Sequence, residues 1–298
     1  MRFLAQLRKT ILSILALTLM MGWMPAMITA QAPPSYPPGE LDKLVTSIAL
    51  YPDPLLAQVL AAATFPDQIP DAAKWADEHH YLRGNDLARA ITEDHLPWDA
   101  SVQAMLPFPS VLEMMASDMN WTSELGNAFL AQQQDVMDAV QRMRKRARDY
   151  GYLRSNGQVV VAGGPYVTIV PVNPAFVCVP VYDPLIVFAP PRPGFFVGGA
   201  IRFGFGISLG FAFRPWGWGT SRFYWDRHEL FLADAHWGRT WANRGSYHHP
   251  YEGFQRWNGQ RGVEQHERIA RSEAERRAAH EGHERPHEEH HGGHEGHH

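Results

Sequence analysis

The residues best suited to chemistry gather at the C-terminus of the chain. Half of the 16 histidines lie after residue 279, mostly three or four residues apart and with glutamates between them. They are His280, His283, His287, His290, His291, His294, His297 and His298. Neutral imidazoles at this density bind Zn²⁺, Ni²⁺ or Cu²⁺. We therefore expect divalent metal binding by the tail. The alternative is a polar tail whose histidines have no role until they are protonated at acidic pH.

Evidence for a catalytic centre is weaker. Asp77-Glu78-His79-His80 and Asp94-His95 supply acid and base groups, but adjacent residues on a helix point in different directions. The only cysteine, Cys178, lies between two valines, which favours a small buried residue over a nucleophile. One cysteine also excludes an intramolecular disulfide. No cofactor is required by these patterns, and an enzyme directed at the cell wall is the least favoured class.

Composition restricts the other classes. A formal net charge of -4 over 298 residues argues against a nucleic-acid-binding protein, which normally shows a basic surface. Hydrophobic residues make up 45% of the chain, enough to bury one good core with a smaller second module. Most of the 25 glycines lie after residue 150. We therefore expect a regular segment followed by an irregular one.

The N-terminus has the pattern of a signal peptide, residues 1–30. Arg2, Arg8 and Lys9 precede a short apolar run over 11–21, and Ala30 is a small residue suited to cleavage. The run is too short for a comfortable membrane span. We expect a mature chain that begins at Gln31, has no transmembrane helix and is exported to the periplasm, the outer envelope or the medium.

A helical domain is predicted over residues 40–153, after a Pro-rich linker over 31–39. In the corner Tyr51-Pro-Asp-Pro54, proline ends one helix and Asp53 can cap the next. Apolar residues spaced three and four positions apart predict a long last helix over 125–150. The apolar pattern lapses only at Gln132 and Gln133. Its basic residues near Arg144 oppose the negative end of the helix dipole. Binding of an anionic surface is the alternative for this basic run.

A β-rich module is predicted over residues 154–258. Short β-branched runs separated by glycine and proline indicate short edge strands. Residues 201–213 alternate bulky and small side chains with a period of two, which predicts one strand with a single apolar face. We expect this face, including Phe205, to cover the core. Self-association or membrane contact through 201–213 is the alternative.

Six of the ten tryptophans fall between residues 215 and 257. We expect them to fix loops onto a core, and stacking on a cell-wall glycan is the alternative. Residues 259–298 hold Glu, Arg and His with few large apolar side chains. Such a tail is expected to be disordered or a solvated helix.

Several motifs resemble the bacterial family known as domain of unknown function 3300. They are Leu41-Asp-Lys-Leu-Val, Ala49-Leu-Tyr-Pro-Asp-Pro-Leu-Leu-Ala-Gln-Val59, Trp98-Asp99, Met105-Leu-Pro-Phe-Pro-Ser-Val-Leu112, Val170-Pro-Val-Asn-Pro174 and Val179-Pro-Val-Tyr-Asp-Pro184. The resemblance implies an exported protein of Gram-negative bacteria and transfers no catalytic residue.

These patterns together predict an α+β fold: an N-terminal all-helical domain, a smaller β-rich module and a disordered His-rich tail. The favoured function is a structural or interaction protein of the cell envelope, with an envelope protein or a cell-wall glycan as its partner. Metal binding by the tail is the alternative function.

Overall fold

The computed structural model describes residues 31–191, 194, 198–247 and 249. The expected signal peptide, the end of the β-rich module after residue 249 and the whole His-rich tail lie outside these residues. The chain divides into two units, residues 1–33 and 34–298, and the description below concerns the second. Among the described residues, no helix is both long and apolar enough to cross a membrane.

The predicted helical segment is confirmed. It contains α2 (Pro38–Val45), α3 (Asp53–Ala63), the short 3-10 helix η1 (Pro66–Gln68), α4 (Ile69–Glu78), α5 (Gly84–Glu93), α6 (Ala100–Gln103), α7 (Pro109–Ser117), α8 (Met119–Ala131) and α9 (Gln133–Asp149). Prolines stand in the first turn of α2, α3, α4 and α7, where the missing N–H costs nothing.

Helix α3 is the centre of the core. Its residues are buried except for Pro54, so the helix is covered on all sides by other elements. Helix α8 approaches it closely at Gly126, where an added Cβ atom would lie 1.9 Å from the carbonyl oxygen of Ala63. Only glycine permits this approach.

The long last helix expected over 125–150 is two helices, so that prediction is wrong. The break falls at Gln132, which has φ -140° and ψ 48°. Its side-chain amide accepts a bond from the N–H of Tyr36 at 2.7 Å and donates one to the carbonyl of Tyr36 at 3.2 Å. The lapse in the apolar pattern therefore marks a helix end that holds the N-terminal linker.

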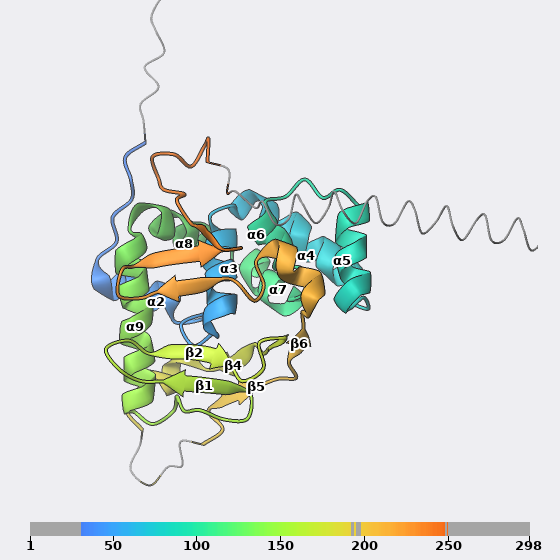
Figure 1. Ribbon diagram of the computed structural model, residues 1–298. Helices are drawn as coiled ribbons and strands as arrows, with labels where there is room; N and C mark the ends of the chain where they lie inside the picture. The colour runs from blue at the N-terminus through green and yellow to red at the C-terminus, as the bar shows by residue number, and fades with distance from the viewer. Residues whose placement is uncertain (1–30, 192–193, 195–197, 248, 250–298) are drawn as a thin grey trace, which may run out of the picture. The chain divides into compact units, whose positions relative to one another are not determined.

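The described residues after α9 form small antiparallel sheets, as predicted. Strand β1 (Val159–Ala162) pairs with β2 (Thr168–Pro171), β3 (Phe176–Val177) with β6 (Ile207–Ser208), and β4 (Pro180–Tyr182) with β5 (Ile201–Phe203). Strands β7 (Arg222–Tyr224), β8 (Glu229–Leu232) and β9 (Ala235–His236) form a three-stranded sheet. Helix α10 (Pro184–Val187) follows β4, and the 3-10 helix η2 (Phe211–Trp216) follows β6. In Figure 1, α9 runs beside the other helices and continues beside β1 and β2.

The single strand expected over 201–213 does not form. The stretch is divided among β5, β6 and η2, and Gly210 has a left-handed φ of 51° that ends the extended run. Its bulky side chains do not share one environment: Leu209 and Phe213 are buried, whereas Phe205 and Phe211 are exposed. The prediction that Phe205 covers the core is therefore wrong.

The tryptophans fix loops onto the core, as expected. Trp216, Trp218, Trp225 and Trp237 are buried and belong to the same apolar cluster as α3. The indole of Trp216 donates to Gln103 Oε1 at 3.0 Å, and that of Trp218 donates to the carbonyl of Ala104 at 2.9 Å. Trp257 lies outside the described residues. The helical and the β-rich segments thus contribute to one shared core.

Candidate functional site

Arg144 on α9 is the polar centre of this core. Its side chain is fully buried, and its Nη1 atom lies 2.5 Å from Oδ1 of Asp53. It also donates to the carbonyls of Ala49, Tyr51 and Val167 at 2.8, 2.8 and 3.0 Å. The guanidinium therefore joins both sides of the proline corner to the segment that enters β2.

Asp53 has a different role from the helix cap expected from the sequence. Position 52 precedes α3, and no side chain caps the helix. The carboxylate instead accepts from Arg144, from the N–H of Ile169 at 3.3 Å and from the indole of Trp225 at 3.2 Å. Arg144 was expected, with the other basic residues of this helix, to oppose the helix dipole, but its side chain is instead buried against Asp53. A buried charge needs a partner of opposite sign, and Asp53 supplies it.

Two further polar side chains, buried Gln141 and partly buried Tyr182, hold the β-rich segment in place. The Gln141 side chain accepts from the N–H of Val167 at 2.7 Å and donates to its carbonyl at 3.1 Å. The Tyr182 hydroxyl donates to the carbonyl of Thr46 at 2.8 Å. Burial raises the pKa of Tyr182 well above its usual value, so the hydroxyl stays a neutral donor. The Gln141 bonds hold the segment that enters β2, and the Tyr182 bond holds β4 against the end of α2.

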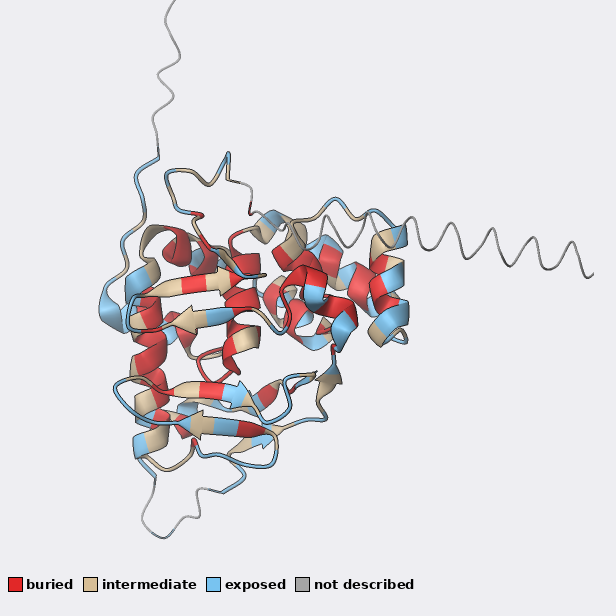
Figure 2. Cartoon of the chain, in the orientation of Figure 1, coloured by how far each residue is buried: buried red, intermediate tan, exposed pale blue. Residues whose placement is uncertain are grey.

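The outward face carries a set of exposed apolar side chains. Val160 and Val170 are directly opposite each other in the β1–β2 ladder, and both are exposed. Val172 follows on the same side of the chain by the alternation of strand residues. Phe176 and Phe205 are also exposed. We call these five residues the apolar patch; Figure 2 shows the exposed parts of β1 and β2 beside their buried neighbours.

Hydrogen bonds and close contacts join the parts of the apolar patch. The N–H of Val172 donates to the carbonyl of Gln158, and the Gln158 side chain donates to the carbonyl of Gly204 at 2.9 Å. On the other side of Phe205, a Cβ atom added to Gly206 would lie 3.0 Å from Cβ of Phe176. The residues before and after Phe205 thus contact the hairpin and Phe176, while the Phe205 side chain itself is fully exposed.

The apolar patch lies in a nearly uncharged part of the chain. Between residues 155 and 213 only Asp183, Arg192 and Arg202 are charged, although charged residues make up 19% of the whole chain. Isolated exposed apolar residues are common on protein surfaces, but a joined set in an uncharged segment is typical of an interaction site.

The outer edge of β1 is blocked by the chain that leads into it. The Ser155 hydroxyl accepts from the N–H of Val161 at 2.9 Å, and Asn156 Oδ1 accepts from the N–H of Val159 at 3.0 Å. The N–H of Asn156 donates to the carbonyl of Val159 at 2.9 Å. These groups occupy the positions that a further strand would use. A partner would therefore contact the face of the hairpin and not its edge.

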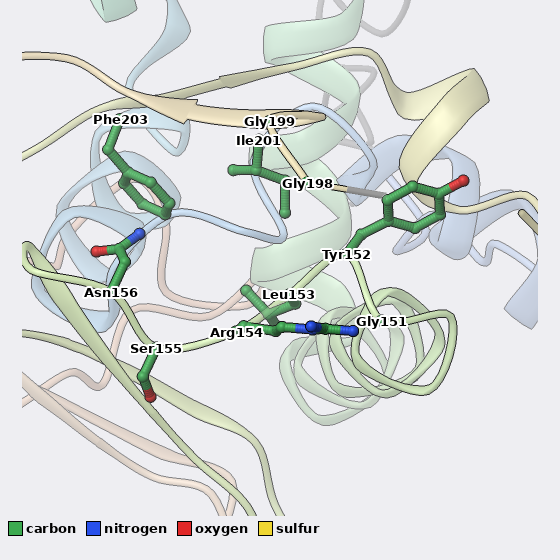
Figure 3. A pocket seen from close by; sticks show the side chains of 10 residues that line it. All are labelled: Gly151, Tyr152, Leu153, Arg154, Ser155, Asn156, Gly198, Gly199, Ile201 and Phe203. Atoms are coloured by element: carbon green, nitrogen blue, oxygen red, sulfur yellow. The ribbon is translucent and has the colours of Figure 1, made fainter. Parts of the chain in front are cut away.

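A cleft of about 290 Å³ lies where α9 ends. Ile201 and Phe203 form one wall, and Leu153, Arg154 and Ser155 lie opposite them (Figure 3). Arg154 is exposed, and the Ser155 hydroxyl is already engaged with β1. The cleft thus presents a mixture of apolar and polar groups and one solvated cation, a combination that selects no particular ligand.

The predicted metal ligands, His280 to His298, lie outside the described residues. Within the described part of the chain, no group of three or more His, Cys, Asp or Glu residues could hold a metal ion. Cys178 is buried, and burial raises the pKa of its thiol, as expected of a packing residue. The His228 ring lies 2.8 Å from Asp138 Oδ1, which ties the β7–β8 turn to α9.

The stretch Gly206-Ile-Ser-Leu-Gly210 matches the Gly-x-Ser-x-Gly pattern of α/β hydrolases. That motif functions as a strained turn between a sheet strand and a helix, with a histidine beside the serine. Here Ser208 lies in the two-residue strand β6 opposite Phe176, and its φ is not left-handed. No hydrogen bond joins Ser208 to a histidine in the described structure. Among the described residues, this stretch therefore lacks both the strained turn and the neighbouring histidine of that motif.

Comparison with known proteins gives the family. Residues 37–259 match the family described as "Protein of unknown function (DUF3300)". The chain belongs to the DUF3300 family. The family match contains both the proline corner with Asp53 and the whole apolar patch. It ends before the histidines of the tail.

One relative of this DUF3300 chain is "Uncharacterized protein YacH" of Escherichia coli (strain K12), 32% identical over 238 aligned residues. The match covers 62% of this chain and 38% of the relative, so the chain spans well under half of the relative's length. No solved structure matches the chain.

Proposed function

We propose that this DUF3300 chain is an exported protein of the bacterial cell envelope that acts by binding a protein partner through the apolar patch. The observation that supports this most directly is the joined set of exposed apolar side chains in a nearly uncharged segment. The basic and apolar N-terminal pattern, followed by Ala30, supports export.

The position of the patch also supports a binding role. The polar anchors of the core, Arg144, Gln141 and Tyr182, all hold the β-rich segment against the helices. A rigidly held surface loses little conformational entropy when it binds a partner. The tryptophans that could have stacked on a glycan are mostly buried, which favours a protein partner over a cell-wall glycan.

The test is site-specific photo-crosslinking in intact cells of the native organism. A photoreactive residue at position 205 or 170 should give a defined protein adduct, and Leu185, which is 85% exposed on α10, is the matched control position. Val172→Asp should remove the adduct formed from position 205. No adduct from 205 or 170, or an equal adduct from 185, would refute the binding role of the patch.

Export is tested separately on the native protein. Mass spectrometry of the fractionated protein should find an N-terminus at Gln31 outside the cytoplasm. An intact Met1 terminus would refute the cleavage.

The histidines of the tail support a second candidate function, the binding of Zn²⁺, Ni²⁺ or Cu²⁺. Eight imidazoles with intervening glutamates form several overlapping sets of ligands without requiring a fold. Removal of residues after Gly262 would separate the two functions, because a metal-dependent phenotype should disappear while a phenotype that depends on the patch should remain.

A further inference from the structure

We infer that the partner of the apolar patch is a second copy of the same chain, bound face to face across a two-fold axis. This inference rests on the proposed function, because it names the occupant of the same surface.

The charge distribution favours a second copy. In a two-fold interface each residue lies near the same residue of the second chain, so a charged patch would face charges of the same sign. The patch residues lie in 155–182 and 203–213, two stretches that contain no charged residue. Two such faces approach each other without electrostatic repulsion.

The same neutrality disfavours other occupants. An anionic lipid surface attracts clusters of lysine and arginine, and Arg202 is the one described cation between residues 155 and 213. The chain after residue 263 is rich in Glu, Arg and His. That tail therefore has the wrong chemistry to cover valine and phenylalanine side chains.

The blocked edge of β1 favours a closed pair over a chain of copies. Open strand edges lead to edge-to-edge association that continues without limit. Ser155 and Asn156 occupy this edge, whereas the side chains of Val160 and Val170 on the face are exposed. Two antiparallel ladders that pack face to face, about 10 Å apart, would interdigitate these side chains.

The experiment measures the mass of the mature full-length chain in solution by sedimentation over a wide range of concentration. We expect a reversible dimer. Phe205→Asp and Val170→Asp should each raise its dissociation constant at least about tenfold, because a buried unpaired carboxylate opposes association. Leu185→Asp should leave the dissociation constant unchanged. All three positions are exposed, so the substitutions should leave the folded chain stable. Thermal melting of each variant checks this.

Crosslinking of two differently tagged copies completes the test. A photoreactive residue at position 205 should give an adduct that carries both tags. A chain that is monomeric at every concentration, or a dimer that both aspartate variants leave intact, would overturn the inference. If the adduct from position 205 contains a different protein, the inference fails while the proposed function stands. If neither position 205 nor position 170 gives an adduct, both fail.

Discussion

Arg144 Nη1 lies 2.5 Å from Asp53 Oδ1, although 91 positions separate the two residues along the chain. The pair lies beneath the proline corner and beside β2, because Arg144 donates to Tyr51 and to Val167 while Asp53 accepts from Ile169. This ion pair therefore couples the packing of the helices to the position of the β1–β2 hairpin that bears the apolar patch.

Arg144→Met should lower the free energy of unfolding by about 3–5 kcal/mol, because the loss of one partner leaves a buried carboxylate and three carbonyls without their donor. The matched control is Arg142→Met. Its pair with Asp42 is partly exposed, so we expect a loss of about 1 kcal/mol or less. Urea unfolding measures both. Equal losses would show that the buried pair has no special role.

Gly126→Ala should destabilise the protein by more than about 1 kcal/mol, since its Cβ atom would overlap the Ala63 carbonyl and force α8 away from α3. Gly39 in α2 has no atom within 4 Å of an added Cβ. Gly39→Ala should therefore be neutral, or stabilising by up to about 1 kcal/mol. Thermal melting of the two variants gives the comparison.

Phe213→Ala and Phe211→Ala should differ sharply, although both residues belong to the alternating stretch. Phe213 is fully buried, and its truncation should cost about 3–5 kcal/mol. Phe211 is 81% exposed, so its truncation should change stability by no more than about 0.5 kcal/mol. Similar effects at the two positions would contradict the different burial of these two residues within η2.

His249 should make stability depend on pH between about 4 and 6.5. Burial lowers the pKa of His249 from 6.5 to about 4. In this window the unfolded chain binds the proton and the folded chain does not, so stability falls as the pH drops from 6.5 towards 4. His249→Phe keeps a ring that can stack on Trp237 but cannot titrate. This variant should lose less stability than the original chain over the same window.

Truncation after Gly262 should abolish the binding of several equivalents of Ni²⁺ or Zn²⁺, measured by calorimetry, without lowering the melting temperature. In the full chain, binding should weaken as the pH falls below about 6, because only neutral imidazole binds metal. A truncated chain that keeps tight, stoichiometric metal would reveal a site in the remaining residues.

Local signals in the sequence were sufficient for the helices and the corner. Proline at the first helical turns and apolar residues at helical spacing identified the helical segment, because both act within a few residues of where they occur. The burial of Trp216 and Trp218 could also be expected from their size and apolar surface.

Tertiary structure alone decided the role of the polar residues. Arg144 and Asp53 each have a satisfactory local explanation, as a cation near a helix end and as a helix cap, and only their long-range contact reveals the buried pair. The period-two pattern of 201–213 predicted that bulky and small side chains alternate. It could not predict with how many strands or helices the stretch would pack. The extended run is interrupted between β5 and β6, where Phe205 is exposed, and ends at Gly210 before η2, where Phe213 is buried. Local periodicity fixes which residues share a side of a regular strand, whereas burial depends on what the rest of the chain places against that side.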